Sequence, residues 1–233
     1  MSNLATTFWT SGKLEEAEKL DQEVLKVRTE AFGTSHPDTI LAMSYLATTF
    51  SRGGKFGEAE KLEKEVLRVR TEAFGPGHPD TIQAMSNLAT TFWRSGKLEE
   101  AENLFQEVLK VVTEAFGPSH PDTIQAMSNL ATTFWRSEKL EEAEKLEQEV
   151  LKVRTEAFGM SHPDTIQAMS YLAATLSRGG KFEEAEKLEQ EVLKVRTEAF
   201  GLSHPNTIQA MSNLATTFSR GGKLGEAEKL EQE

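Results

Sequence analysis

The residues most able to do chemistry in this sequence are five histidines, each followed by proline and each 42 residues from the next. They are His36, His78, His120, His162 and His204. Ligands of one zinc ion lie about 2.1 Å from it, so they must approach one another to roughly 4 Å. Equivalent points on stacked helical units are about one helix diameter apart, ~10 Å. We therefore expect no metal site and no cofactor, and interpret these histidines as residues that begin helices and pack between units.

Paired glutamates, such as Glu99 with Glu100 and Glu141 with Glu142, are the second candidate for catalysis. They recur at the expected start of a helix, where negative side chains interact favourably with the helix dipole. Catalysis needs one constellation of groups with different roles, whereas this sequence supplies the same groups in each copy of a motif. The sequence offers no nucleophile-base pair and no glycine-rich phosphate loop. We expect a solvated face there, in a protein that is not an enzyme.

Composition and charge exclude further classes of function. The chain has 233 residues, no cysteine and a formal net charge of -11. Nonspecific binding to nucleic acid depends on lysine and arginine that neutralise phosphates, so we expect no nucleic-acid partner. No apolar run approaches the ~20 residues of a membrane span, so we expect no membrane partner. A chain without cysteine suits a reducing compartment, and we expect a cytoplasmic location.

The histidines belong to the motif G-x-x-H-P-[DN]-T-I, which recurs with a period of 42 residues. A fixed period of about 20 to 50 residues is typical of a repeat array, in which each unit buries its apolar face against its neighbours. We expect a single domain over residues 1–233. Its copies are expected at about 1–33, 34–75, 76–117, 118–159, 160–201 and 202–233, with the first and last incomplete.

Each copy predicts two helices. In the third copy, a proline suited to the first helical turn follows His78, and apolar residues at helical spacing predict a helix over about 79–94, which we name helix A. Gly96 can take the left-handed conformation that ends a helix. A second apolar stripe then predicts helix B over about 98–116, including Phe116 at its end.

The string N-L-A-x-x-F-x-x-x-G-K-[LF]-x-E-A-E-x-L-x-x-E-V-L, from Asn87 to Leu109, resembles the tetratricopeptide repeat in the long form found in kinesin light chains. The H-P-D-T sequence before helix A is similar to the linker of that subfamily. The resemblance covers the whole chain and implies an all-α, right-handed solenoid of helix-turn-helix repeats. Near-identical arrays of this kind also resemble the sensor regions of fungal NLR-like receptors. HEAT and armadillo repeats have similar lengths, but their patterns fit these residues less well.

A second face of helix A carries polar, aromatic and basic residues, and in tetratricopeptide arrays this face lines a concave groove. The resemblance implies that Asn87, Asn129 and Asn213 hydrogen-bond the backbone of a bound peptide, in a series that Tyr45 and Tyr171 interrupt. We expect a protein or peptide segment as the partner. The expected groove residues are Gln83, Ser86, Asn87, Thr90, Trp93, Arg94, Gln125, Asn129, Thr132, Trp135, Arg136, Gln167, Tyr171, Arg178, Asn213, Arg220, Tyr45 and Arg52.

Arginine and tryptophan near the end of helix A leave alternatives open. The arginines either stabilise the helix C-terminus or bind acidic groups of a ligand. Because most acidic residues fall on helix B, the groove can be locally basic, and we expect an acidic partner. The position of Trp9, Trp93 and Trp135 is serine in other copies, so it is not tightly packed core and partial exposure is expected. Ligand anchoring and packing against the next repeat are both open for these indoles.

The copies differ at few positions. Phe105 replaces an acid and Val112, seven residues later on the same helical face, replaces an arginine. Neutral drift and a contact patch with another chain are both open. Glu138 replaces a turn glycine, where a left-handed backbone costs ~1 kcal/mol.

The sequence begins within helix A and ends within helix B, which leaves apolar residues of both ends with few local partners. These residues include Leu4, Phe8, Leu224 and Leu230. Burial of apolar surface is favourable, so we expect homo-oligomers that form through the chain ends, with Phe105 and Val112 as a lesser candidate surface.

The sequence therefore predicts a non-enzymatic scaffold that binds a protein or peptide in the helix A groove. One alternative is a structural spacer or self-assembling repeat module. The other is the ligand-sensing region of a larger NLR-like receptor.

Overall fold

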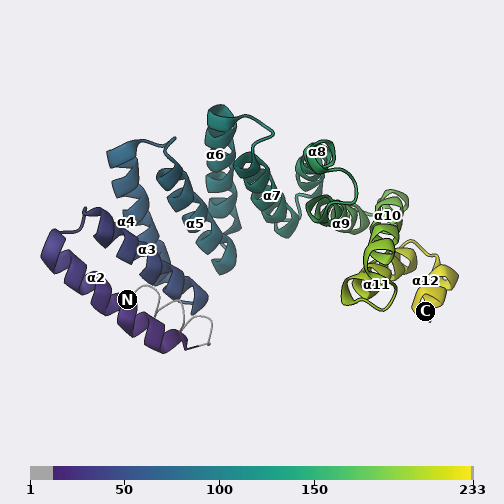
Figure 1. Cartoon of the computed structure of the whole chain (residues 1–233), viewed down its shortest axis with the longest axis horizontal. Helices are drawn as coiled ribbons and strands as arrows, with labels where there is room; N and C mark the ends of the chain where they lie inside the picture. Colours follow the sequence, from purple (N-terminus) through teal and green to yellow (C-terminus); the bar gives the residue numbers. More distant parts are fainter. Residues whose placement is uncertain (1–12, 232–233) are drawn as a thin grey trace. The chain divides into compact units, whose positions relative to one another are not determined.

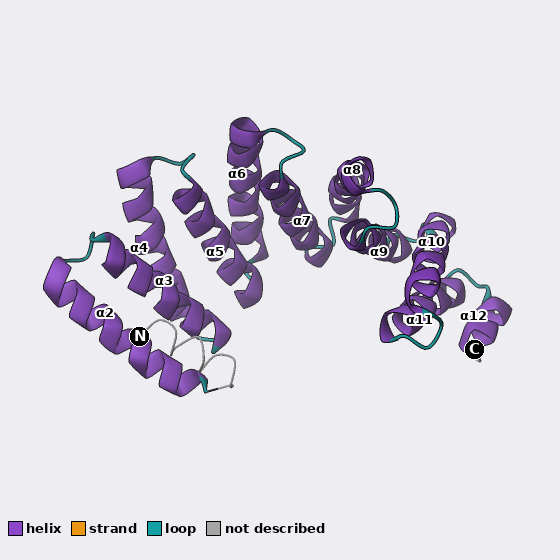
Figure 2. Cartoon of the chain, viewed as in Figure 1, coloured by secondary structure: helices purple, strands orange, loops and turns teal. Residues whose placement is uncertain are grey.

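The computed structural model describes residues 13–231, and throughout that span it is helical, without strands (Figure 2). Leu4, Phe8 and Trp9 lie outside the described residues. In chain order the helices are α2 (Leu14–Phe32), α3 (Pro37–Arg52), α4 (Phe56–Phe74), α5 (Pro79–Ser95), α6 (Leu98–Phe116), α7 (Pro121–Arg136), α8 (Leu140–Phe158), α9 (Pro163–Arg178), α10 (Phe182–Phe200), α11 (Pro205–Arg220) and α12 (Leu224–Glu231) (Figure 1). Odd-numbered helices are the expected helices A and even-numbered ones the helices B. The all-α architecture of helix-turn-helix repeats is confirmed.

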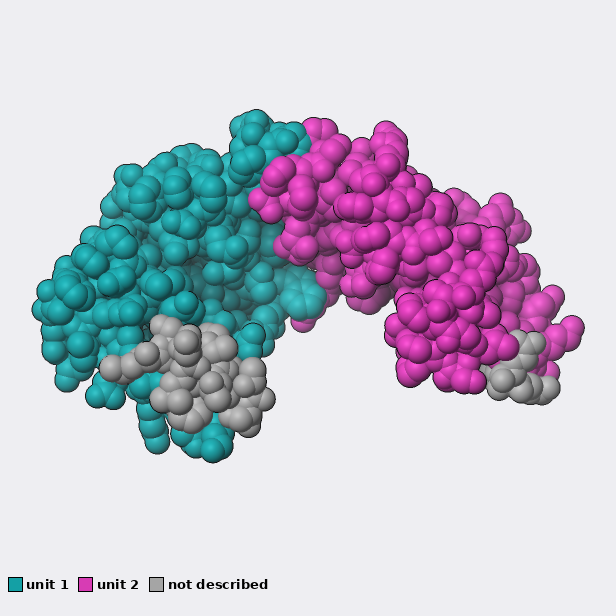
Figure 3. All heavy atoms as spheres, in the orientation of Figure 1, with its two compact units in different colours: residues 1–117 teal, residues 118–233 magenta. Residues whose placement is uncertain are grey.

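The chain forms two compact units, Met1–Gly117 and Pro118–Glu233 (Figure 3). The division falls between two copies of the repeat. In unit 1 each helix from α2 to α6 packs on the next along the chain, and in unit 2 the helices from α7 to α12 do the same. Each unit is therefore a stack of alternating helices A and B.

Histidine and proline together begin every described helix A. The Nδ1 atom of His78 accepts a hydrogen bond from the Asp80 N–H at 3.2 Å, and Pro79 occupies the first turn, where no backbone donor is needed. The same cap precedes α3, α7, α9 and α11. The His78 ring also stacks on Phe74, with 4.5 Å between ring centroids. The expected role of the histidines in helix entry is confirmed.

The phenylalanine at the end of helix B is more exposed than the sequence pattern predicts. Phe116, which the sequence pattern places in the buried stripe, is 41% exposed, and its counterpart Phe74 is 53% exposed. Helix B ends at the glycine that follows, because Gly75 and Gly117 have φ angles of 83° and 85°, a backbone conformation that favours glycine. The phenylalanine therefore lies outside the core, and the Phe74 ring stacks on the ring of the next histidine.

The core of each unit repeats one set of contacts. In unit 1, Ile40 and Met43 of α3 pack with Val66 and Val69 of α4. In unit 2 the equivalent residues of α9 and α10 are Ile166, Met169, Val192 and Val195. One pattern of residue types therefore yields the same A-on-B contact in both units, as a nearest-neighbour array requires.

Phe105 and Val112 contradict the expectation of a surface patch. They are 3% and 1% exposed, so both side chains are buried. The acids that stand in place of Phe105 elsewhere are also buried, at Asp21, Glu63 and Glu147. This position is buried in α2, α4, α6, α8 and α10, so the aromatic ring replaces a buried carboxylate and offers no contact surface to another chain.

Glu138 takes the left-handed conformation that its place in the turn requires, with φ of 61°. Among the described residues it is the non-glycine residue with positive φ. Its carboxylate forms an ion pair with the Arg178 guanidinium from the following helix A. The repeat thus combines a strained backbone with an additional contact between copies.

Two substitutions at Glu138 should separate strain from ion pairing. Glu138→Ala removes the ion pair and keeps a side chain in the left-handed region, whereas Glu138→Gly removes both the ion pair and the strain. We expect the glycine variant to be more stable than the alanine variant by about 1 kcal/mol. Urea denaturation of both variants measures the difference; equal midpoints would show that the turn carries no strain.

Candidate functional site

Within each unit, side chains on the second face of successive helices A contact one another. In unit 1, α3 and α5 meet where Arg94 donates to the Ser51 Oγ at 3.0 Å. Gln83, Thr90 and Arg94 of α5 are exposed, and Ser86 and Asn87 are half-buried. In the same unit the expected site residues also include Tyr45, Arg52 and Trp93. Those of unit 2 are Gln125, Asn129, Thr132, Trp135 and Arg136 on α7, Gln167, Tyr171 and Arg178 on α9, and Asn213 and Arg220 on α11.

The asparagines of this face are held in one orientation by glutamine. Gln83 Nε2 donates to Asn87 Oδ1 at 2.8 Å, one helical turn away. The same bond joins Gln125 to Asn129 at 2.9 Å and Gln209 to Asn213 at 2.8 Å. Because the glutamine occupies the amide oxygen, the asparagine presents its Nδ2 hydrogens as donors. Such donors suit the carbonyl oxygens of an extended chain.

Tyr171 takes the asparagine position in α9 and is 50% exposed. The interruption of the amide series is therefore real at this copy. An exposed phenol ring offers apolar area together with a hydroxyl group, so this step of the face differs in chemistry from its neighbours.

The arginines at the end of helix A contact the previous copy. Arg94 and Arg220 donate to Ser51 and Ser177, at 3.0 and 3.4 Å. Both serines are buried, at 5% and 4% exposure. These arginines therefore connect successive helices A, a contact between copies that was not among the sequence-based alternatives.

Where tryptophan replaces this serine, the arginine of the next helix A contacts the indole ring instead. Trp135 occupies the position of Ser51 and Ser177, and the Arg178 guanidinium lies 4.1 Å from its ring centroid. Cations are attracted to the face of an indole ring, and here the planar guanidinium also covers it. Trp135 remains 36% exposed and Trp93 is partly exposed, which confirms the expected partial exposure.

A hollow of about 420 Å³ lies on the helix A face of unit 2. Trp135 and Arg178 line one part of it, and Asn213, Thr216 and Arg220 line another. The hollow thus brings together an exposed indole, two guanidinium groups and an oriented amide donor from three successive helices A. Aromatic and arginine side chains of this kind dominate the binding energy of many protein interfaces.

A family model decides the identity of the array. The model of the tetratricopeptide repeat matches residues 1–72, 64–112, 80–156 and 164–233. The chain belongs to the tetratricopeptide repeat family. Comparison with curated proteins gives no significant match.

Solved structures share the fold of this tetratricopeptide array. A putative kinesin light chain with nearly identical TPR-like repeats from Podosopora anserina is 22% identical, with a TM-score of 0.77 over 84% of this chain and 93% of the other. BtubC (BKLC) from P. vanneervenii is 20% identical, with a TM-score of 0.77 over 94% and 88% of the two chains. MamA from Desulfovibrio magneticus RS-1 is 14% identical, with a TM-score of 0.61 over 83% and 91%. The kinesin-light-chain form of the repeat, expected from the sequence, is confirmed.

Buried acids behind the helix A face are the feature that sequence reasoning missed. Glu63 is 6% exposed, and its Oε1 lies 3.1 Å from the Thr91 hydroxyl, which in turn lies 3.2 Å from the Ser51 Oγ. Burial raises the pKa of Glu63 to about 7, although the Thr91 hydroxyl and the Arg94 charge lower it in part. Arg94 thus closes a chain of polar contacts that leads from the tetratricopeptide surface to the interior.

The same acid recurs in other copies. Burial raises the pKa of Glu147 to about 7 and also raises the pKa of Asp21 and Glu189. The signal that could have located these residues is Phe105, since an apolar residue at a repeated position indicates that the position faces the core.

Between residues 13 and 231, no group of three or more histidine, aspartate or glutamate side chains could hold a metal ion. The helices in that range are too short or too polar to cross a membrane.

Proposed function

We propose that the helix A face binds an extended, acidic segment of another protein and that the array acts as a non-enzymatic scaffold. The oriented asparagine donors carry this proposal, because three of the copies present the same amide N–H groups, which match the carbonyl acceptors of a peptide backbone. Tetratricopeptide arrays generally bind proteins or peptides, which supports the same function. We take residues 1–233 as one domain and propose a cytoplasmic location, which a sequence without cysteine suits.

The hollow in unit 2 supports a specific proposal for the chemistry of the ligand. Arg178 is engaged by Trp135 and by Glu138, whereas Arg220 lies over the Phe182 ring and donates a hydrogen bond to Ser177. Arg220 therefore offers further guanidinium donors to a carboxylate, and the exposed Trp135 ring offers an apolar wall. We propose that an acidic residue next to a large apolar residue is the part of the ligand that binds here.

Peptide binding tests the proposal. The probes are extended peptides that contain acidic residues around one leucine or phenylalanine, and the same peptides with lysine in place of the acids. We expect the acidic peptides to bind and the lysine peptides to fail. Binding should weaken as salt rises, since exposed charges are screened over about 8 Å at physiological ionic strength.

Asparagine variants test whether the helix A face binds the peptide. A hydrogen bond is worth about 1 kcal/mol, so replacement of Asn87, Asn129 and Asn213 by alanine should weaken binding at least about tenfold. Asn103→Ala is the matched control, because Asn103 is an exposed asparagine on helix B. Isothermal titration calorimetry measures both. Equal affinities of the triple variant and the control would contradict the proposal.

The structural alternative, a spacer or self-assembling repeat module, stays a hypothesis from the sequence. The sensing role in a larger NLR-like receptor stays a hypothesis from the sequence.

A further inference from the structure

A pair of hydroxyl groups connects a buried acid of unit 1 to an arginine of the helix A face. The Thr91 Oγ1 lies 3.1 Å from the Glu63 Oε1 and 3.2 Å from the Ser51 Oγ. Arg94 donates to the same serine oxygen at 3.0 Å. We call this series of contacts, from acid through threonine and serine to arginine, the hydroxyl chain. Its acid, threonine and serine are all buried, so water does not screen them from one another.

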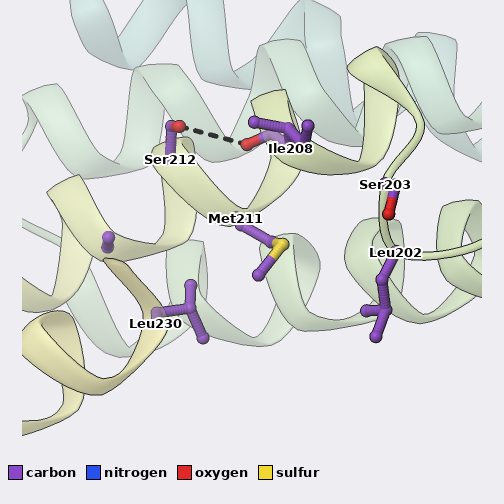
Figure 4. Close-up of a pocket in the computed structure, with 7 residues that line it drawn as sticks. Leu202, Ser203, Ile208, Met211, Ser212 and Leu230 are labelled. Atoms are coloured by element: carbon purple, nitrogen blue, oxygen red, sulfur yellow. Dashed lines mark hydrogen bonds between the residues drawn. The ribbon is translucent and has the colours of Figure 1, made fainter. Parts of the chain in front are cut away.

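The hydroxyl chain differs from the usual hydrogen bonding of this face. Other hydroxyl groups of helix A donate within their own helix, as Ser212 does to the Ile208 carbonyl at 3.0 Å (Figure 4). The Thr91 hydroxyl instead contacts groups of two other helices, α4 and α3. It therefore links the interior to the surface.

Unit 2 contains the same hydroxyl chain, and there the chain borders the hollow. The Thr217 Oγ1 lies 3.1 Å from the Ser177 Oγ, to which Arg220 donates, and Thr217 also hydrogen-bonds the Glu189 carboxyl group. All four residues line the hollow of about 420 Å³. A carboxylate that binds Arg220 thus lies at the outer end of the chain, with Glu189 at the inner end.

Tryptophan interrupts the chain in another copy of unit 2. Glu147 is buried like Glu63, but Trp135 occupies the position of Ser51 and Ser177, and the Arg178 guanidinium lies over its ring. An indole N–H only donates, so it accepts no hydrogen bond from a guanidinium. Unit 2 therefore contains one buried acid that is connected to an arginine and one that is not.

Ionisation of the acid fixes the direction of the hydroxyl chain, because each hydroxyl group has a single hydrogen to donate. A carboxylate only accepts, so Thr91 donates to Glu63, and Ser51 then donates to Thr91. All donors, including Arg94, point inward toward the negative charge. When the carboxyl group is protonated, that charge is absent and the arginine is attracted inward less strongly.

Few charged groups lie around the two acids. Those near Glu63 are Glu60, its partners Lys64 and Lys97, and Arg94. Those near Glu189 are Glu186, its partner Lys223, and Arg178 and Arg220 across the hollow. Burial raises the pKa of Glu63 to about 7, against the opposing effects of the Thr91 hydroxyl and the Arg94 charge, so this acid changes charge near neutral pH. Burial also raises the pKa of Glu189.

We propose that Glu63 and Glu189 couple the binding of an acidic ligand to the uptake of protons, so that the helix A face binds the ligand more tightly as the pH falls. This inference rests on the proposed function, since it requires ligand carboxylates at Arg94 and Arg220. An ionised acid at the inner end of the chain repels a second negative charge at the outer end. The bound carboxylate therefore favours protonation of the acid, and by linkage protonation favours binding of the carboxylate to the same extent.

Isothermal titration calorimetry between pH 6 and pH 8.5 tests the proposal. The probe is the acidic peptide made with aspartate, whose ordinary pKa of about 3.9 keeps it ionised throughout. The Kd of the parent chain should rise roughly three- to tenfold over this range, as expected for charges about 10 Å apart that are partly screened. The double variant Glu63→Gln/Glu189→Gln should keep the low-pH affinity at every pH.

Glu147→Gln is the matched control, because it removes a buried acid that no hydroxyl chain connects to an arginine. This variant should keep the pH dependence of the parent. Circular dichroism at each pH verifies that all chains are folded. Titrations in buffers of different ionisation enthalpy count the protons taken up on binding: at about pH 7 the parent should take up protons, and the double variant far fewer.

The outcomes separate this inference from the proposed function. If the parent binds the peptide with the same affinity at every pH, the coupling is wrong and the proposed function stands. If the pH dependence persists in the double variant, other groups such as the histidines cause it, and the coupling is again wrong. A peptide that binds at no pH contradicts the proposed function and this inference with it.

Discussion

Raising the pH from about 5 to about 8.5 should lower the free energy of unfolding of the array by several kcal/mol. Glu63 and Glu147 have an ordinary pKa of 4.5, which burial raises to about 7 in the folded chain. Between these two values the unfolded chain releases protons that the folded chain keeps, so stability falls as pH rises through this window and levels off above it. One pKa unit is worth about 1.4 kcal/mol, so each group accounts for about 3 kcal/mol.

Glutamine variants isolate this effect from other titrations. Glu63→Gln and Glu147→Gln keep the size of the side chain and remove the charge. The double variant should be more stable than the parent at about pH 8.5, with a much flatter dependence of its urea midpoint on pH. Glu65→Gln is the control, because Glu65 pairs with Arg68 on the surface and its pKa is lowered. A parent midpoint that is constant over this range contradicts the burial of charge at these positions.

Phe105→Ala should destabilise the chain by roughly 3 to 5 kcal/mol, because truncation of a buried phenylalanine loses apolar burial and leaves a cavity. Phe105 is 3% exposed, so its ring is surrounded by the protein. Urea denaturation measures the loss. Phe116→Ala is a matched control: this ring is 41% exposed, and its truncation should cost much less.

The same variant separates a core residue from an interface residue. If Phe105 met a second chain, Phe105→Ala would reduce association and leave the stability of the monomer nearly unchanged. We expect the reverse, namely a large loss of stability with the oligomeric state of the folded chain preserved.

Much of the fold could be predicted because it depends on contacts close in sequence. A histidine cap, a proline in the first turn and a glycine after helix B act within a few residues, so one copy was sufficient to place α5 and α6. The left-handed backbone at Glu138 could be predicted in the same way, by comparison with the glycines of other copies. The exposure of Trp135 followed from a position that accepts two very different volumes.

The arginine contacts could not be predicted from one copy. Arg94 and Arg178 have the same place in the repeat, but one donates to Ser51 and the other covers Trp135. The difference depends on a residue 43 positions earlier, in the preceding helix A. The buried acids were missed for a related reason. Most glutamates of an acidic helix are exposed to solvent, so the sequence alone does not show which of them face the core.

The contacts between copies have a further consequence for how such a gene can change. The side chains that join one copy to the next are separated by constant sequence intervals of 37 residues, as in Lys97 with Glu60, or 43 residues, as in Arg94 with Ser51. Unequal recombination that inserts or deletes a whole 42-residue copy leaves every such pair matched. It nevertheless moves each tryptophan and serine to a new place along the helix A face. If this face binds a ligand as proposed, its specificity can change through rearrangement of copies while the contacts between copies are kept.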